Sequence, residues 1–302
     1  MATPMLIAQL LNLLYNIVDR IYIGKIPGEG TLALASIGLC FPFVTLITAF
    51  ANLFGLGGAP LCAMARGKGN REGAQGIMVN AGFMLLLSGA VLTVLGIAFH
   101  RPLLYLFGAS EVTYPYASSY IVIYLIGTLC VMLSLGLNPY INCQGFARTG
   151  MLTVALGAAA NIVLDPIFIF ALHLGVRGAA IATVLSQFLS AAWVVKFLTG
   201  KNAELKLDFR GFRPDRQCIQ RITVLGIASF VMSFTDMLVQ VACNATLRNF
   251  GGDIYISVMT VLNSVRQIAQ TRCSPSRTVH LPPSATTMAR GCTSAPGTPS
   301  GL

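Results

Sequence analysis

The stretch NIVLDPIFIF (Asn161–Phe170) decides the fold class, because it places a carboxylate inside an apolar run of 24 residues, Gly150–His173. A charge at the centre of a bilayer costs roughly 3 kcal/mol on insertion scales, so it is kept where it faces a protein or water-filled interior. Asn161 stands four residues before Asp165, and on a helix the two side chains share one face. Pro166 frees a backbone carbonyl one turn earlier. These groups at mid-membrane depth predict a site for a cation or a proton.

The composition of the whole chain is that of a membrane protein. Hydrophobic residues make up 55% of its 302 residues and charged residues 10%, against about 25% charged residues in soluble domains. Small and polar residues interrupt the apolar runs, as expected where helices pack closely and line a polar path. Seven complete spans and the start of an eighth are predicted, each long enough to cross roughly 30 Å of hydrocarbon. The complete spans are 3–24, 32–62, 75–99, 116–143, 150–173, 177–199 and 222–247, and the eighth begins near 253.

The net charge of +10 follows the predicted topology. If the N-terminus is cytoplasmic, the inner connections are much richer in Lys and Arg than the outer ones, which is the positive-inside pattern. The inner residues are Arg66, Lys68, Arg71, Arg148, Lys201, Lys206, Arg210, Arg213, Arg216 and Arg221, and the outer ones are Lys25, Arg101, Arg177 and Arg248. The basic segment 201–221 carries interleaved acids and runs into a span, which argues against nucleic-acid binding. We expect a multi-pass protein of the cytoplasmic membrane, with its N-terminus inside.

The reactive residue types form no recognised catalytic or metal-binding pattern. Eight cysteines are scattered, mostly within spans, without a CxxC pair or a Cys/His cluster. They are interpreted as small apolar residues, with neither a disulfide framework nor a metal site. No nucleophile–base pair and no HExxH motif occurs. We therefore expect no enzyme activity, no cofactor and no obligate protein partner.

The longest hydrophilic connection divides the chain into unequal parts. The predicted organisation is a six-helix N-terminal lobe (1–199), a cytoplasmic linker (200–221) and an incomplete second lobe (222–270). The order of a span, a glycine-rich turn and a new span recurs after the linker, when Gly30 is aligned with Gly252. Repeated lobes of this kind are common in secondary transporters, with the substrate site between them.

The segment 271–302 changes character abruptly. It holds five Pro, five Ser, six Thr and no acidic residue, and it shows no helical or strand periodicity. A natural disordered tail and a shifted reading frame are both compatible with this composition. The frameshift is favoured, because the change falls inside the incomplete eighth span. The first span begins almost at Met1, so a lead-in before it is also expected to be missing.

Five segments, in order along the chain, resemble the motifs of one transporter family. They are LYNIVDRIYIG (14–24), GLGGAPLCAMARGKG (55–69), NPYINCQGFARTGM (138–151), NIVLDPIFIF (161–170) and GVRGAAIATVLSQ (175–187). Over roughly residues 3–270 the chain resembles the multidrug and toxic compound extrusion (MATE) transporters. The resemblance implies an all-α integral membrane fold of twelve helices in two six-helix lobes, of which this chain holds the N-terminal lobe and a fragment of the second. It also implies export of small-molecule drugs or organic cations, driven by inward flow of Na⁺ or H⁺.

The resemblance also implies where the coupling cation binds. In many members an acidic cluster of the N-terminal lobe carries it, and here that cluster maps onto Asp19, Asn161, Asp165 and Thr183. Two carboxylates close together, such as Asp19 and Asp165, can share one proton or hold Na⁺. Asp236 resembles a position where some branches carry a glutamate, so it is a further candidate for substrate or coupling.

Each of these residues also has a purely structural interpretation. Asp19 could pair with Arg20 at the membrane edge. Asn161 could pack between helices, and Asp165 with the following proline could mark a helix end. Thr183 lies among alanines, where a threonine usually bonds its own backbone. The residues by themselves leave these interpretations open.

The function that the sequence favours is cation-coupled antiport. The alternative is a lipid-linked oligosaccharide flippase of related architecture, which would need basic residues in its cavity to hold a pyrophosphate. The predicted spans show acids at depth and almost no Lys or Arg. Because alternating access needs two lobes around a shared site, we expect this chain alone not to transport. The choice between Na⁺ and H⁺ and the identity of the drugs stay open.

Overall fold

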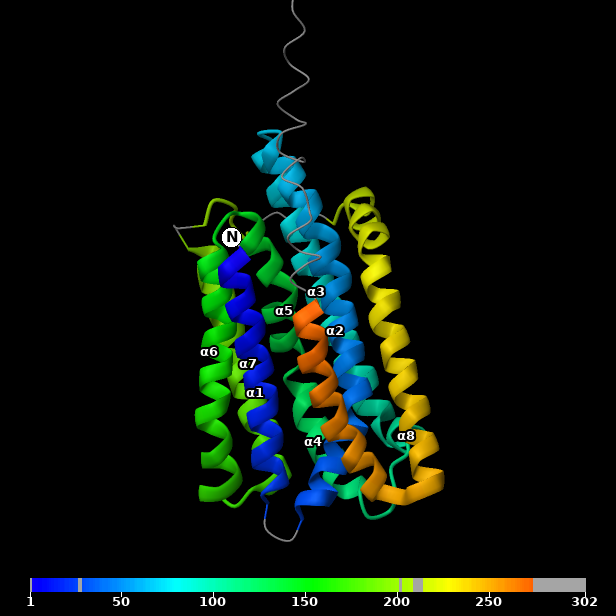
Figure 1. Ribbon diagram of the computed structural model, residues 1–302. Coiled ribbons are helices and arrows are strands. Elements are labelled where there is room, and N and C mark those ends of the chain that lie inside the picture. The colour runs from blue at the N-terminus through cyan, green and yellow to red at the C-terminus, as the bar shows by residue number, and fades with distance from the viewer. Residues whose placement is uncertain (1, 27–28, 201–202, 209–213, 274–302) are drawn as a thin grey trace, which may run out of the picture.

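The structure is a computed structural model that describes residues 2–273 except 27–28, 201–202 and 209–213 (Figure 1). Side chains are described for residues 7–263, except in these gaps and at positions 249 and 251. The predicted tail, 271–302, lies outside the described residues apart from its first three, which belong to the last helix.

Every described element is a helix. In chain order they are α1 (Ala2–Gly24), α2 (Gly30–Gly67), α3 (Arg71–Leu106), α4 (Tyr114–Ile126), α5 (Thr128–Cys143), α6 (Ala147–Pro166), the π-helical turn η1 (Ile167–Ala171), α7 (Gly175–Thr199) and α8 (Arg216–Cys273).

Helix α2 lies at the centre of the bundle. It packs against α3, α4, α5 and α8, while α1 packs mainly against α6 (Figure 1). In the most apolar stretch of α2, 61% of the residues are buried, against 17% in the first part of α8, 216–248. The helix that loses most surface to its neighbours is therefore the scaffold on which the others are placed.

Local chemistry accounts for two of the helix boundaries. Asn70 caps the start of α3, because its side-chain oxygen accepts a hydrogen bond of 2.8 Å from the backbone N–H of Gly73. Pro166 ends α6, since a proline has no N–H to continue the helical ladder. The wider π-helical turn η1 follows directly, so the backbone is irregular immediately after Asp165.

Five described helices are long and apolar enough to cross a membrane, and a sixth span results if α4 and α5 are counted together. Helix α1 covers the predicted first span but is not one of these six. The predicted span 116–143 is broken, because the axes of α4 and α5 differ by 57°. The break falls at Gly127, where a Cβ atom would collide with the side chain of Val184 on α7. Close packing against α7 accounts for the glycine at this bend.

Helix α8 begins at Arg216, within the segment 200–221 that was predicted to be a linker. It turns sharply at Gly252, where φ is 65° and ψ is −160°, a combination that only glycine adopts readily. In the predicted repeat Gly252 corresponds to Gly30, the first residue of α2. In the first lobe, α1 ends and a short connection leads to α2. At the corresponding place in the second part of the chain, α8 continues through a kink at one residue, Gly252.

Hydrogen bonds hold the part of α8 after the kink against the first lobe. The hydroxyl of Ser257 donates to the carbonyl of Thr31 on α2 at 2.7 Å. The hydroxyl of Ser110, which lies between α3 and α4, donates to the carboxylate of Asp253 at 2.9 Å. The returning half of α8 is therefore a packed element of the bundle (Figure 1).

Candidate functional site

The two carboxylates that were predicted to be partners meet in the structure. Asp19 lies on α1 and Asp165 on α6, two helices that pack along each other, and the two acids lie close enough to interact electrostatically. Asp165 is completely buried, with 0% of its surface exposed, and Asp19 is partly buried. Helix packing thus produces a buried acid pair from residues far apart in the chain.

Asn161 completes this cluster. It lies one turn before Asp165, is 1% exposed, and donates a hydrogen bond of 3.2 Å from Nδ2 to Oδ1 of Asp165. Three further oxygen atoms, Oδ2 of Asp165, Oδ1 of Asp19 and Oδ1 of Asn161, are buried without a hydrogen-bond partner in the described part of the chain. Buried acceptors are rarely left without a donor, because their desolvation is then uncompensated. The cluster is therefore chemically suited to a shared proton or a small hard cation.

Arg20, the neighbour of Asp19, is an interior residue. Only 7% of its surface is exposed. Its Nη1 donates to the carbonyl of Thr260 on α8 at 2.6 Å, and its guanidinium lies 4.7 Å from the centre of the Phe41 ring. This placement does not match the alternative in which Asp19 and Arg20 form a surface ion pair at the membrane edge.

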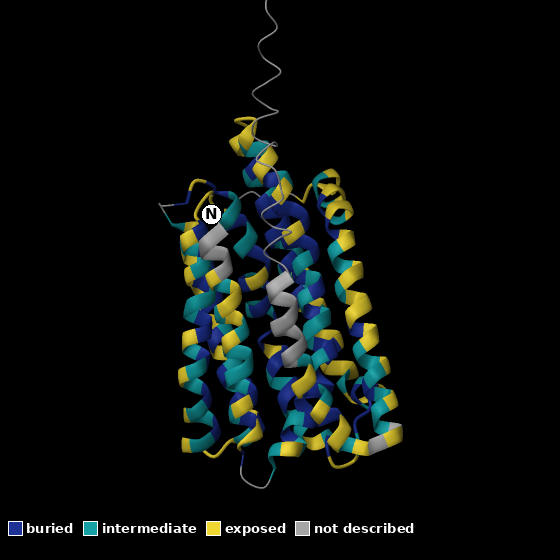
Figure 2. Cartoon of the chain, viewed as in Figure 1, coloured by how far each residue is buried: buried dark blue, intermediate teal, exposed yellow. Residues whose placement is uncertain are grey.

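The other two predicted residues, Thr183 and Asp236, make no hydrogen bond to the acid pair within the described part of the chain. The hydroxyl of Thr183 on α7 donates to the carbonyl of Ala179 at 2.9 Å, as its structural interpretation predicts. The hydroxyl hydrogen is thus already donated to Ala179, and a cation would bind the lone pairs of the hydroxyl oxygen. Asp236 is exposed on the first half of α8, a segment with many exposed positions (Figure 2).

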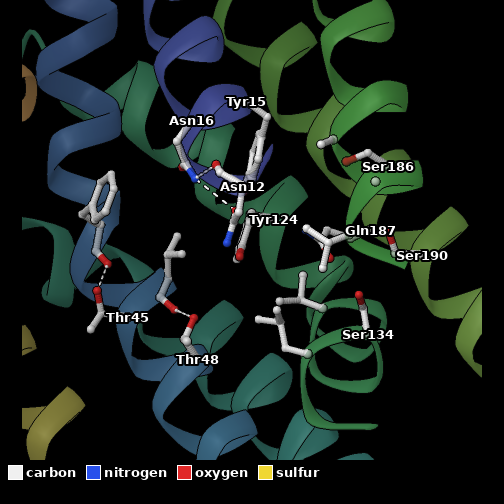
Figure 3. Close-up of a pocket in the computed structure, with 17 residues that line it drawn as sticks. Asn12, Tyr15, Asn16, Thr45, Thr48, Tyr124, Ser134, Ser186, Gln187 and Ser190 are labelled. Atoms are coloured by element: carbon white, nitrogen blue, oxygen red, sulfur yellow. Dashed lines mark hydrogen bonds between the residues drawn. The ribbon is translucent and has the colours of Figure 1, made fainter. Parts of the chain in front are cut away.

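A cavity of about 310 Å³ lies between α1, α2, α5 and α7 (Figure 3). Its polar lining comes from five helices and includes no charged residue among those that the structure describes. The polar side chains are Asn12, Tyr15 and Asn16 of α1, Thr45 and Thr48 of α2, Tyr124 of α4, Ser134 of α5, and Ser186, Gln187 and Ser190 of α7.

Helix α1 links this cavity to the acid pair. Tyr15 lines the cavity and also lies close enough to Asp19 and Asp165 to interact electrostatically with both. Asn16 lines it too and donates to the carbonyl of Asn12 at 2.7 Å. Sequence reasoning did not assign these cavity residues. The available signal was the i, i+4 spacing of Asn12 and Asn16 in an apolar helix, which places both amides on one face.

Within the described residues, no group of three or more His, Cys, Asp and Glu side chains is arranged to hold a metal ion. Asp19 and Asp165 supply two carboxylates, and Asn161 supplies an amide. That set suits a proton or a cation such as Na⁺ that is also bound by neutral oxygens.

Comparison with known proteins places this arrangement in a family. Residues 4–167 match the sequence model of the MatE family. Multidrug export protein MepA of Staphylococcus haemolyticus (strain JCSC1435) is 27% identical over 248 residues, which cover 82% of this chain and 54% of that protein. MepA of Staphylococcus aureus (strain MRSA252) is 23% identical over the same shares. The chain spans about half the length of the curated relatives it matches.

Solved structures show the same relationship. The MATE multidrug transporter DinF-BH, solved in complex with a ligand, aligns with a TM-score of 0.83 and 29% identity, over 90% of this chain and 60% of that one. An inward-facing MATE transporter of the MOP superfamily aligns with a TM-score of 0.80 and 29% identity, over 87% and 59%. The family match runs from α1 to the end of α6 and includes the acid pair and Asn161. With more than half of its length matched, this all-α, multi-pass membrane chain belongs to the MatE family, the multidrug and toxic compound extrusion transporters.

Proposed function

We propose that this chain forms the cation-coupling part of an antiporter that exports drugs or organic cations across the cytoplasmic membrane. The observation that carries the proposal is the buried pair of Asp19 and Asp165, with oxygen atoms that have no donor. The names of the relatives support the substrate class, since MepA is a multidrug export protein and DinF-BH is a multidrug transporter that was solved with a bound ligand.

The geometry suggests how binding at the acid pair changes the cavity. A proton or Na⁺ between Asp19 and Asp165 draws α1 and α6 together, whereas two ionised carboxylates repel each other. Tyr15 and Asn16 lie within about one turn of Asp19 and line the cavity. A shift of α1 therefore changes the cavity wall, and a ligand that prefers one position of α1 shifts the population toward it.

The coupling ion is tested by ligand stabilisation of the purified chain. We expect its thermal unfolding midpoint to rise with NaCl over equimolar choline chloride if Na⁺ binds, or as pH falls if a proton binds. A ligand at 100 times its Kd adds about 2.7 kcal/mol of stability. Asp165→Asn should abolish the response, and Asp236→Asn, which changes an exposed acid, should keep it. Equal responses of the wild type and Asp165→Asn would contradict the proposal.

Thr183→Val separates the two ions further. Na⁺ needs several oxygen ligands, and the variant removes one candidate, whereas a proton needs only the two carboxylates. If Na⁺ couples through the predicted set, the NaCl response should weaken in Thr183→Val. If a proton couples, the pH response should be unchanged. The hydroxyl of Thr183 now bonds only its own helix in the described structure, so the substitution should fold.

The predicted orientation is also a proposal, with the N-terminus in the cytoplasm. Lys25 follows α1, and Lys68 lies between α2 and α3, so they lie at opposite ends of α2. In intact cells, a membrane-impermeant maleimide should label Lys25→Cys and should label Lys68→Cys only after permeabilisation. The reverse result would place the N-terminus outside. Labelling the wild type in parallel measures the signal that comes from the natural cysteines.

The rival flippase reaction finds no support in the cavity. A pyrophosphate headgroup needs Lys or Arg, which supply charged donors, and the described lining of the cavity holds neither. We also propose that residues 1–302 by themselves do not transport, because alternating access needs two lobes. Cells that produce only these residues should accumulate a fluorescent organic cation such as ethidium to the level of cells without them.

A further inference from the structure

Two cysteines meet at the ends of α2 and α5. The Sγ atoms of Cys62 and Cys143 lie 3.5 Å apart, although 81 positions separate them in the sequence. Cys62 is fully buried, and Cys143, the last residue of α5, is partly buried. Among the described cysteines, only these two have sulfur atoms in contact. The sequence alone treats them as unrelated small residues, so the pair is a product of the fold.

The surroundings of the pair favour thiol chemistry. Arg66, one turn after Cys62, donates from Nη1 to the carbonyl of Cys143 at 2.9 Å, and this holds a guanidinium beside the two sulfurs. A neighbouring cation stabilises a thiolate, which is the nucleophilic form. The side chain of Arg66 is 32% exposed and forms an ion pair with Glu204. The charged pair beside the sulfurs is therefore partly exposed, whereas Cys62 itself is buried.

Each sulfur is also held in place. Cys143 Sγ donates to the carbonyl of Tyr140 at 3.2 Å, and Cys62 Sγ contacts the carbonyl of Ala74 at 3.5 Å. Both helices are fixed nearby, since the fully buried Tyr140 donates from its hydroxyl to the carbonyl of Phe54 on α2 at 2.8 Å. A disulfide needs the sulfurs to approach to about 2.05 Å, so the two side chains must leave these hydrogen bonds to close it.

We propose that Cys62 and Cys143 form a redox-active dithiol that closes to an intramolecular disulfide in the presence of a peroxide. One thiol loses its proton, and the thiolate attacks a peroxide oxygen. The O–O bond breaks to give a sulfenic acid and hydroxide, and the hydroxide takes up the released proton to form water. The second sulfur then attacks the first, the S–O bond breaks, and a second water leaves. Two thiols and one hydrogen peroxide give one disulfide and two waters, so two electrons pass from sulfur to peroxide.

The disulfide would join α2 to α5 next to the ion pair of Arg66 and Glu204. That pair fastens the connection after α7 to the end of α2. A cross-link over 81 residues restricts the unfolded chain, which raises stability. The oxidised protein should therefore unfold at a higher temperature than the reduced one. This inference does not depend on the proposed transport function.

The test is a thiol count on the purified chain. After hydrogen peroxide, quenching and denaturation, maleimide labelling should fall from eight thiols to six, and a reductant should restore them. Peptide mass spectrometry should find Cys62 linked to Cys143. Cys62→Ser and Cys143→Ser should give no such peptide, and Cys218→Ser should behave like the wild type. Eight labelled thiols after peroxide, or a link between other cysteines, would overturn the proposal.

Phenylarsine oxide provides a second measurement, because it bridges two thiols only when they are neighbours. In the wild type it should protect both Cys62 and Cys143 from maleimide. In Cys62→Ser and Cys143→Ser, the remaining cysteine of the pair should still be labelled. If neither reagent joins the two sulfurs, the proposal is wrong. If phenylarsine oxide bridges them and peroxide leaves both as thiols, the redox role is also excluded, since the sulfurs are adjacent but do not react.

Discussion

At the residue scale, Asp165 is held by one described donor, the side-chain amide of Asn161. An ionised carboxylate has about four acceptor positions, so one donor leaves most of them unused. Oδ2 of Asp165 and Oδ1 of Asp19 are buried without a hydrogen-bond partner in the described chain. The bond from Asn161 is therefore the described side-chain hydrogen bond that stabilises the Asp165 carboxylate.

Asn161→Ala should lower the free energy of unfolding by about 1–3 kcal/mol, because it removes a buried donor from a buried carboxylate. The matched control is Asn12→Ala, which changes an exposed asparagine and should shift stability by less than about 0.5 kcal/mol. Thermal unfolding of the two variants in the same detergent compares them. Equal shifts would show that the bond from Asn161 to Asp165 contributes nothing specific.

At the scale of the elements, glycines decide how closely the central helix meets its neighbours. A Cβ atom at Gly226 on α8 would collide with the backbone carbonyl of Leu53 on α2, and one at Gly127 would collide with Val184 on α7. A backbone carbonyl cannot rotate away as a side chain can. The contact between α2 and α8 therefore tolerates no side chain at Gly226.

Gly226→Ala should destabilise the protein by about 1–3 kcal/mol, because the added methyl overpacks a helix contact. Gly76 on α3 is the matched control, since it is also inside a helix and a Cβ there meets nothing within 4 Å. Gly76→Ala should stabilise the protein by about 0.5–1 kcal/mol, through helix propensity alone. Thermal unfolding midpoints that shift in opposite directions would bear this out, and shifts of the same sign would count against the close approach.

At the scale of the whole molecule, the returning half of α8 closes one end of the bundle against α1 and α2. Thr260 receives the hydrogen bond from Arg20, and Ser257 bonds the backbone of α2 at Thr31. The acid pair and this closure are one residue apart on α1, since Asp19 precedes Arg20. The acid pair and the packing of α8 are therefore mechanically connected through α1.

A cross-link tests this closure. A Cβ atom at Gly38 on α2 would lie 3.4 Å from the Cβ of Thr260, near the separation of about 3.8 Å found in disulfides. The double variant Gly38→Cys, Thr260→Cys should therefore form a disulfide under mild oxidation, detected by peptide mass spectrometry. Gly76→Cys with Thr260→Cys is the control and should not. Failure of the first pair in a folded protein would mean that this end is open.

Several features could be predicted from the sequence because they depend on local composition. The positions of the helices follow from apolar runs of sufficient length, and the buried acids follow from charge within such runs. The family motifs also indicated that Asp19 and Asp165 belong to one site. The break at Gly127 was not predicted, because the bend depends on contact with α7 and the hydropathy of the sequence does not change there.

The sequence by itself determined that this is an all-α membrane chain with acids at depth, since the bilayer requires long apolar helices whose backbone is satisfied internally. Only the tertiary structure decided which side chains meet. The polar cavity, the return of α8 at Gly252 and the contact of Cys62 with Cys143 each join residues from different helices. Such contacts depend on the rotation and approach of packed helices, which the order of residues along one helix does not reveal.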